Sequence, residues 1–191
     1  MAAPSKHRQA IVDAAVTLFR QKGYSATGLN DIVEASGAPK GSLYHYFPAG
    51  KAAIGEAAVR EAGCRVCDTV TELAERASSA GELIRAHAGL LAQWMEQSGY
   101  RDGAPMATVL LENAPTDAAI TAAGLEALTG WRRILAARLT RDGFSAERAD
   151  RLATLAMAAL DGALIQARVA QSGAPIEVAA AEFAALLATA R

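Results

Sequence analysis

The stretch from Gly28 to Lys51 constrains the fold more than any other part of this 191-residue chain. It contains two short helical patterns separated by a break. Leu29, Ile32 and Val33 share one face of the first pattern at helical spacing. The break is Ser-Gly-Ala-Pro at residues 36–39, where glycine can end one helix in the left-handed conformation and proline can open the next. The stretch therefore predicts two short helices joined by a tight turn.

The second of these helices should run from Pro39 to about Tyr46, with Leu43 and Phe47 pointing inward. Its outward positions then hold one lysine, a small hydroxyl and three aromatic rings with polar tips: Lys40, Ser42, Tyr44, His45 and Tyr46. Such a face is unusual for a helix that only meets solvent, but it suits a helix that enters the major groove of DNA. Two of the aromatics, Tyr44 and Tyr46, also fit the simpler role of half-buried packing residues.

Composition favours helices over sheets in the rest of the chain. Hydrophobic residues make up 52% of the sequence but aromatic residues only 5%, so alanine and leucine supply most of the apolar content. No run of valine and isoleucine alternates with polar residues between turn signals, as a half-buried strand would require. We therefore expect an all-α fold of about nine helices.

Apolar spacing and turn residues predict the other helices over residues 6–22, 51–78, 81–97, 105–113, 116–140, 146–171 and 175–190. Thr27, Ser79 and Ser145 precede helical patterns and are expected to act as N-caps, Thr27 without the acidic partner of a capping box. The inward faces of the later helices are expected to include Trp94, Leu125, Leu155 and Val169. These helices should form a larger C-terminal bundle.

The charge distribution suggests two domains, an N-terminal helix-turn-helix domain at residues 1–50 and a larger helical domain at 51–191. Residues 1–51 contain six basic and three acidic side chains, whereas the remaining 140 residues contain 13 basic and 17 acidic ones. The whole chain has a net charge of −1. A basic N-terminal part on an acidic body is typical of a nucleic-acid contact confined to one end.

Several other classes of protein and site are disfavoured by the residue content. The chain has no Walker loop and no H-E-x-x-H, G-x-S-x-G or G-x-G-x-x-G motif, and His7, His45 and His87 are far apart. We therefore expect no enzyme activity, no metal site and no cofactor. No long apolar run follows the N-terminal charges, and no stretch of about 18 uncharged apolar residues occurs. We expect a cytoplasmic protein without a membrane partner.

Cys64 and Cys67 form a C-x-x-C pair inside a predicted helix. A redox role and an incidental presence are both open from the sequence. A disulfide between adjacent turns of one helix would strain the helix and constrain little else. No second pair of ligands completes a zinc site.

The N-terminal region resembles the DNA-binding domain of the TetR family of bacterial regulators over about residues 6–60. The resemblance rests on Ala14 to Phe19, Gly23, Tyr24, Thr27, Ile32, Ala35, Gly37, Gly41, the run from Leu43 to Phe47, and Lys51. Farther along, residues 103–108 and 111–112 look like the LmrA/YxaF-like branch of that family. This branch usually has a cysteine where Ala104 stands and a Lys-Glu pair where Lys51-Ala52 stands.

The resemblance implies a homodimer that places one recognition helix in each of two major grooves of a palindromic, double-stranded DNA operator. It assigns phosphate contacts to Thr27, Tyr44, His45, Tyr46 and Lys51. Base reading would fall to Lys40, Gly41 and Ser42, because glycine lets the backbone approach the bases and lysine can donate to guanine. The last two long helices would pair with their copies in the dimer, although packing within one chain explains their small residues equally well.

The resemblance also implies a small-molecule effector pocket in the C-terminal domain. Candidate lining residues are His87, Leu91, Trp94, Met95, Met106, Leu110, Asn113, Trp131, Met157 and Asp161. The same residues would serve equally well as an ordinary core. The sequence therefore predicts a repressor released by a small hydrophobic or aromatic effector, and as an alternative a DNA-binding regulator whose larger domain binds a partner protein.

Overall fold

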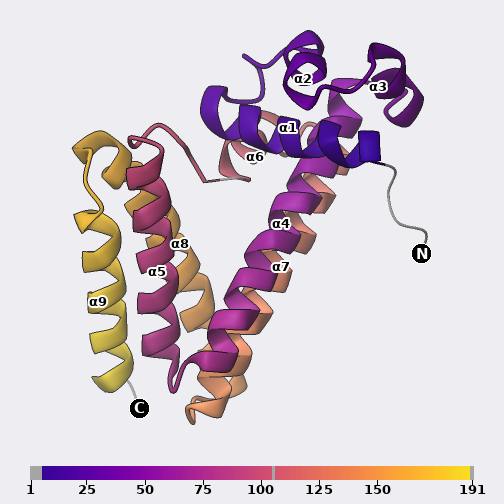
Figure 1. Cartoon of the computed structure of the whole chain (residues 1–191). Coiled ribbons are helices and arrows are strands. Elements are labelled where there is room, and N and C mark those ends of the chain that lie inside the picture. Colours follow the sequence, from indigo (N-terminus) through magenta and orange to yellow (C-terminus); the bar gives the residue numbers. More distant parts are fainter. Residues whose placement is uncertain (1–5, 105, 190–191) are drawn as a thin grey trace. The chain divides into compact units, whose positions relative to one another are not determined.

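The structure is a computed structural model that describes residues 6–104 and 106–189, and every regular element in these residues is an α-helix (Figure 1). In chain order the helices are α1 (Lys6–Lys22), α2 (Leu29–Ser36), α3 (Lys40–Tyr46), α4 (Lys51–Arg76), α5 (Ala80–Gln97), α6 (Ala107–Asn113), α7 (Ala118–Arg141), α8 (Ala146–Ala170) and α9 (Ala174–Thr189). The prediction of an all-α fold is confirmed.

Side-chain caps begin several helices where the sequence predicts them. The Ser79 hydroxyl accepts a hydrogen bond from the Glu82 amide at the start of α5, and the Ser145 hydroxyl accepts one from the Arg148 amide at the start of α8, both at 3.2 Å. These bonds satisfy amides that have no partner within the helix. The expected helix opening at residue 105 and the expected helix end at residue 190 lie outside the described residues.

The chain divides into two compact units, and the border between them does not fall at residues 48–51. The first unit comprises the residues up to Cys64 together with Ala104–Ala127. The second comprises Arg65–Gly103 and the chain from Leu128 onward. Helices α4 and α7 each contribute to both units, because each is one continuous helix across the border. The first unit therefore contains the first half of α4, all of α6 and the start of α7, besides the three N-terminal helices.

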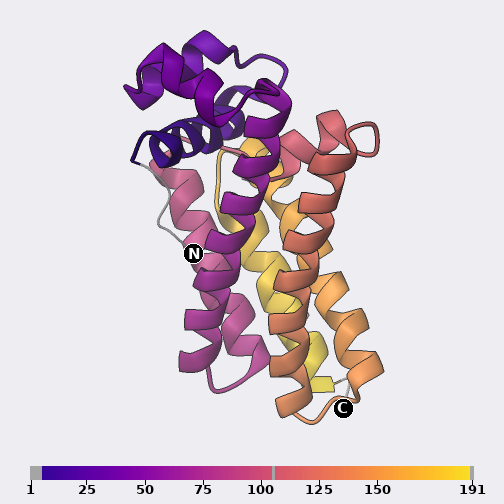
Figure 2. The same ribbon diagram turned by 90° about the vertical axis from the view of Figure 1, so that its right-hand side faces the viewer.

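Missing side chains allow close helix contacts within the first unit. A Cβ atom added at Gly63 of α4 would lie 2.4 Å from the Cβ of Ala127 on α7. One added at Gly124 of α7 would lie 2.4 Å from a methyl group of Leu110 on α6. Both separations are far shorter than any real contact between carbon atoms. Figure 2 shows α4 running beside α7. Gly63 thus weakens α4 locally but permits this approach.

In the second unit α5, α8 and α9 run side by side (Figures 1 and 2). Their facing sides bury aliphatic residues such as Leu83, Leu160 and Ile176. The Asp142 carboxylate after α7 accepts a hydrogen bond of 2.5 Å from the Ala80 amide and one of 2.7 Å from the Arg138 guanidinium. This carboxylate ties the start of α5 to the end of α7.

Four residues that were predicted to face the core are exposed instead. Trp94 is 41% exposed, Leu125 68%, Leu155 49% and Val169 81%. The helices that carry them are apolar on more than one face, so periodicity alone does not identify the packed face. On α5, for example, the buried position beside Trp94 belongs to Met95.

We predict opposite effects for two glycine-to-alanine substitutions inside helices. Gly63→Ala should lower the free energy of unfolding by about 1–3 kcal/mol, because the new methyl group collides with Ala127. Gly89→Ala is the matched control, because a Cβ there meets nothing within 4 Å. It should raise the free energy of unfolding by up to about 1 kcal/mol. Urea denaturation measures both, and equal effects would contradict the close contact between α4 and α7.

Candidate nucleic-acid interface

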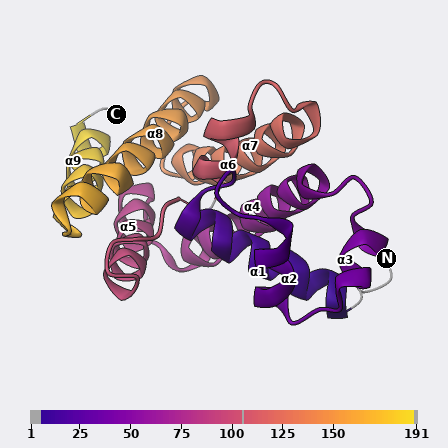
Figure 3. The ribbon, with the colours of Figure 1, turned by 90° about the horizontal axis from the view of Figure 1, so that it is seen from above.

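Helix α1 supplies the platform that holds α2 and α3, which lie across it in Figures 1 and 3. Ile11 and Phe19 of α1, Ile32 of α2 and Leu43 of α3 are all fully buried. Phe47, just after α3, is buried as well. The prediction that Leu43 and Phe47 point inward is confirmed. Because Leu43 occupies the buried side of α3, Gly41 and His45 on the opposite side face away from the platform.

The turn between α2 and α3 has the geometry that its residues predict. Gly37 adopts the left-handed conformation, with φ 61°, and its amide donates to the Glu34 carbonyl at 3.3 Å. The Ser36 hydroxyl accepts a bond from the Ala38 amide at 3.2 Å. Pro39 is the extended residue that precedes α3, with φ −56° and ψ 137°, so the helix begins at Lys40 and not at the proline.

Most side chains that were predicted to read DNA are presented by α3. Lys40, Gly41 and His45 are exposed, Ser42 and Tyr46 are half-buried, and Tyr44 is 49% exposed. The rings of His45 and Tyr46 meet edge to face, with centroids 4.8 Å apart. This helix face therefore combines one positive charge, a hydroxyl and three aromatic rings with polar atoms.

Gly41 is not required by the fold of the protein. A Cβ atom at this position would meet no other atom within 4 Å. Glycine nevertheless lowers helix stability relative to alanine by about 0.5–1 kcal/mol in a helix interior. The absence of a side chain at Gly41 therefore has no explanation within the described chain, and it leaves the backbone of α3 open to close approach from outside.

Thr27 is placed differently from the prediction. Its side chain is fully buried, and its hydroxyl donates to the Gly23 carbonyl at 2.8 Å. The N-cap of α2 is Gly28, whose amide donates to the Asp31 carboxylate at 2.8 Å. The predicted N-cap is therefore wrong by one residue. With Gly28 as the N-cap, Asp31 is the third residue after it and is the acidic partner of a capping box. The Thr27 hydroxyl is not presented to a phosphate.

Lys51 opens α4 and lies against the loop between α1 and α2. Its ammonium group donates to the Ser25 carbonyl at 3.3 Å and lies 4.5 Å from the ring centroid of Tyr24. Burial lowers the pKa of Lys51, while the carboxylates of Glu112 and Asp31 act in the opposite direction. The loop thus holds the ammonium group of Lys51, which the sequence predicts to contact a phosphate.

Glu112 of α6 belongs to this cluster, and the sequence did not predict it. Its two carboxylate oxygens accept hydrogen bonds from the amides of Tyr24 and Ser25 at 2.9 and 2.7 Å. Hydrogen bonds from Ser25, assisted by the Tyr24 amide and by the charge of Lys51, hold the pKa of Glu112 below its usual range. Almost 90 residues separate Glu112 from its partners, so no local pattern could have revealed the contact.

The candidate effector residues are divided between the two units. Met106, Leu110 and Asn113 belong to the first unit, and the Asn113 amide group donates within α6 to the Val109 carbonyl at 2.7 Å. The second unit contains His87, Leu91, Trp94, Met95, Trp131, Met157 and Asp161. Of these, Leu91, Met95, Trp131, Met157 and His87 are buried, whereas Trp94 is exposed.

His87 and Trp131 form a buried polar pair within the second unit. Their rings meet edge to face, with centroids 5.6 Å apart. The Nδ1 atom of His87 and the Nε1 atom of Trp131 have no hydrogen-bond partner among the described residues. Burial lowers the pKa of His87 to about 4, so its imidazole is neutral at pH 7. Burial also raises the pKa of Asp161 to about 6. An unpaired buried polar atom costs about 1–3 kcal/mol.

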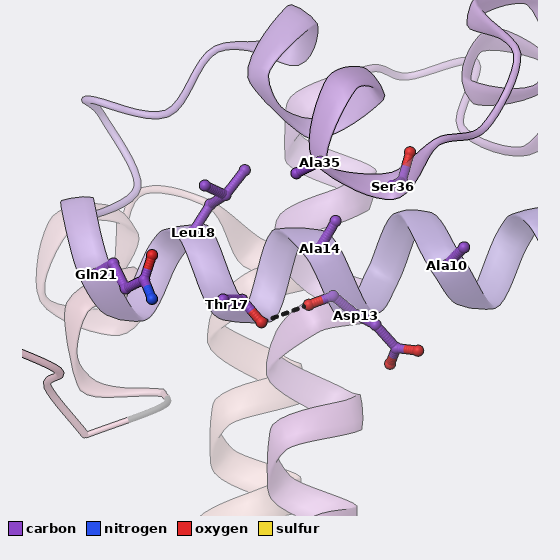
Figure 4. Close-up of a pocket in the computed structure, with 8 residues that line it drawn as sticks. All are labelled: Ala10, Asp13, Ala14, Thr17, Leu18, Gln21, Ala35 and Ser36. Carbon is purple, nitrogen blue, oxygen red and sulfur yellow. Dashed lines mark hydrogen bonds between the residues drawn. The ribbon is translucent and has the colours of Figure 1, made fainter. Parts of the chain in front are cut away.

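An open groove of about 540 Å³ lies between α1 and α2 (Figure 4). Ala10, Asp13, Ala14, Thr17, Leu18, Gln21, Ala35 and Ser36 line it. The Thr17 hydroxyl already donates to the Asp13 carbonyl at 3.0 Å. None of the predicted DNA-binding or effector residues lines this groove, and its walls are mostly small side chains.

The described residues contain no group of three His, Cys, Asp or Glu side chains that could hold a metal ion. Neither Cys64 nor Cys67 takes part in a disulfide among the described residues. Helix α8 is long and apolar enough to cross a membrane by length and composition, and it alone meets those two criteria among the described helices. Nine of its residues are buried inside the protein, as in the core helix of a folded domain.

Comparisons with known proteins agree with this geometry. A family model described as "Bacterial regulatory proteins, tetR family" matches residues 11–58, and one described as "Transcriptional regulator LmrA/YxaF-like, C-terminal domain" matches residues 80–182. The chain is 30% identical to the uncharacterised HTH-type transcriptional regulator YxaF of Bacillus subtilis (strain 168), over 94% of each protein.

Solved structures show the same fold. A regulatory protein TetR from Rhodobacter sphaeroides superposes with a TM-score of 0.80 and 25% identity, over 95% of this chain and 98% of that one. The transcriptional regulator FadR from Bacillus subtilis, solved in complex with stearoyl-CoA, gives a TM-score of 0.68 and 18% identity over 94% and 97% of the two chains. The chain therefore belongs to the TetR family of transcriptional regulators, in the branch with an LmrA/YxaF-like C-terminal domain.

Proposed function

We propose that the protein is a ligand-responsive repressor. It binds a palindromic DNA operator as a homodimer and leaves it when a small hydrophobic or aromatic effector binds to the C-terminal domain. The observation that carries this proposal is the exposed face of α3, where Gly41 leaves the backbone open although no contact within the described chain requires it. Regulators of this family typically act in the cytoplasm, and we propose the same location here.

The contacts to DNA divide into two groups in this proposal. Lys40, Gly41 and Ser42 read base edges, because they occupy the first exposed turn of α3 and a lysine can donate to guanine. The phosphate contacts come from the later exposed residues Tyr44, His45 and Tyr46 and from Lys51. We leave Thr27 out of the second group, because its hydroxyl is buried against the Gly23 carbonyl.

Dimer formation is supported by a second apolar face on α8 and α9. At helical spacing, this face carries Leu155, Ala158, Gly162, Ile165 and Val169 on α8 and Val178, Ala181 and Ala185 on α9. Its largest side chains are well exposed in the single chain, with Ile165 at 65%, Val169 at 81% and Val178 at 60%. Exposed apolar residues at helical spacing are typical of an interaction surface. Small residues among the larger ones allow the helices of two copies to approach closely.

Effector binding is supported by the polar pair His87 and Trp131. The Nδ1 atom of His87 and the Nε1 atom of Trp131 are buried without a hydrogen-bond partner among the described residues of the second unit, whose buried residues also include Met95 and Met157. A few polar groups among apolar side chains are typical of small-molecule sites. The FadR structure shows that a protein with this fold can hold an acyl-CoA ligand. We propose no specific effector from that likeness.

Gly41→Ala tests the DNA-binding face separately from the fold. Because a Cβ at this position meets nothing within 4 Å, the variant should be as stable as the wild-type protein or slightly more stable. Its affinity for an operator selected from random duplex DNA should fall about tenfold or more, because the methyl group enters the space of the bases. Fluorescence anisotropy measures the affinity, and unchanged binding by Gly41→Ala would remove α3 from the base-reading role.

Ile165→Glu tests the proposed dimer face. Burying an unpaired carboxylate in an apolar contact is strongly unfavourable, so this variant should sediment as a monomer at concentrations where the wild-type protein is a dimer. Leu125→Glu is the matched control, since Leu125 is similarly exposed, at 68% against 65%, but lies on α7. It should remain dimeric. If both variants are dimers in analytical ultracentrifugation, the interface lies elsewhere, and a partner protein becomes the better explanation of this surface.

Trp131 provides a direct signal for effector binding. The chain has two tryptophans, so Trp94→Phe leaves Trp131 as the single indole fluorophore. A library compound that releases the operator should change the fluorescence of this variant at the same concentrations. His87→Phe should weaken the release at least about tenfold, because it removes the polar partner while keeping an aromatic ring. Release by a compound that leaves Trp131 fluorescence unaltered would place the effector elsewhere.

A further inference from the structure

We propose that Glu112 on α6 is a positioning residue for the DNA-binding site. Its carboxylate holds the loop between α1 and α2, and that loop in turn holds the ammonium group of Lys51. The inference rests on the proposed role of Lys51 as a phosphate contact. Glu112 itself touches no nucleotide in this proposal. Its contribution is to fix the place from which Lys51 reaches the DNA.

The first link runs from Glu112 to the loop backbone. One carboxylate oxygen accepts the Tyr24 amide at 2.9 Å and the other accepts the Ser25 amide at 2.7 Å. Hydrogen bonds to a charged acceptor are among the strongest in proteins. Two such bonds to consecutive amides fix both the position and the direction of the loop. The lowered pKa of Glu112 agrees with this arrangement, since these bonds favour its charged form.

The second link runs from the same two loop residues to Lys51. The ammonium group donates to the carbonyl of Ser25 at 3.3 Å and lies over the ring of Tyr24 at 4.5 Å from its centroid. The Ser25 carbonyl and the Tyr24 ring therefore hold Lys51, while the amides of the same two residues bind Glu112. Any displacement of the carboxylate moves both groups that hold the lysine.

The loop is also shaped to receive a carboxylate. Gly23 has φ +88°, a conformation that side chains rarely adopt, and a Cβ on it would lie 2.9 Å from the nearer oxygen of Glu112. Beside this contact, the Thr108 hydroxyl donates to the Phe19 carbonyl at 3.1 Å. Helix α6 is therefore attached both to the end of α1 and to the loop that follows it.

Electrostatic attraction to DNA does not explain an acidic residue beside Lys51. A carboxylate close to a phosphate contact repels DNA and lowers affinity. The geometric role and the electrostatic role of Glu112 therefore have opposite signs, which makes them separable. If Glu112 acts by positioning, its removal weakens DNA binding. If it acts only through its charge, its removal strengthens DNA binding.

Glu112→Gln tests the proposal, because it keeps the size of the side chain but replaces one acceptor oxygen by an NH₂ group. That group cannot accept a hydrogen bond from the loop amide that faces it. Affinity for the selected operator should fall about tenfold. Hydrogen exchange at the amides of Tyr24 and Ser25 should accelerate at least about tenfold, while exchange in α5 stays unchanged. Glu112→Asp keeps the charge but is one methylene shorter, and it should weaken binding as well.

Glu126→Gln is the matched control for the loss of one acidic charge. Glu126 lies in the same unit and pairs with Arg60 on α4. This variant should bind the operator as tightly as the wild-type protein or more tightly. Tighter binding by Glu112→Gln as well would overturn the proposal, because charge would then dominate.

A double-mutant cycle shows whether Glu112 acts through Lys51. In a Lys51→Met background, Glu112→Gln should change operator affinity less than about twofold. An equal loss in both backgrounds would overturn the proposed path. The proposed function and the positioning role of Glu112 can be refuted separately. If the wild-type protein does not bind DNA, the proposed function is refuted. Normal wild-type binding that Glu112→Gln leaves unchanged refutes only the positioning role.

Discussion

The burial of Leu43 and Phe47 against α1 is the contact on which the DNA-binding surface depends. Helix α3 has only seven residues, and a helix of that length is not stable in water by itself. Its two buried side chains therefore supply most of the stability of the segment. They also fix its rotation, because burying Leu43 forces Gly41 and His45, which lie on the opposite side of the helix, to face outward. The chemistry of the exposed face follows from that orientation.

The sequence predicted the helix caps and turns that depend on residues close together in the chain. The glycine at residue 37 ends α2 in the left-handed conformation, and the serines at 79 and 145 cap α5 and α8. These three signals depend on neighbouring residues, so the sequence predicts them. The N-cap of α2 was misplaced by one residue, because the burial of Thr27 is a tertiary effect. The contact between Glu112 and Ser25 was also missed, since no pattern reports an interaction across 87 residues.

The apolar residues on α8 and α9 show where periodicity reaches its limit. A helix with a core on one side and a subunit interface on the other is apolar on both. Val169 was therefore predicted to lie in the core, although the single chain leaves 81% of it exposed. The same exposure supports the proposed dimer, which would give two copies of α3 the symmetry of a palindromic operator.

In the proposed function, α3 and Lys51 form a DNA-binding surface that acts in pairs, one from each copy of the chain. Selection of binding sites from random duplex DNA, followed by a titration of the selected site at several salt concentrations, tests it most directly. We predict a palindrome whose half-sites lie about one helical turn apart, and a slope of log K against log salt of about −5 to −7, from about six to eight phosphate contacts per dimer. No enriched sequence, or a slope near zero, would contradict the account.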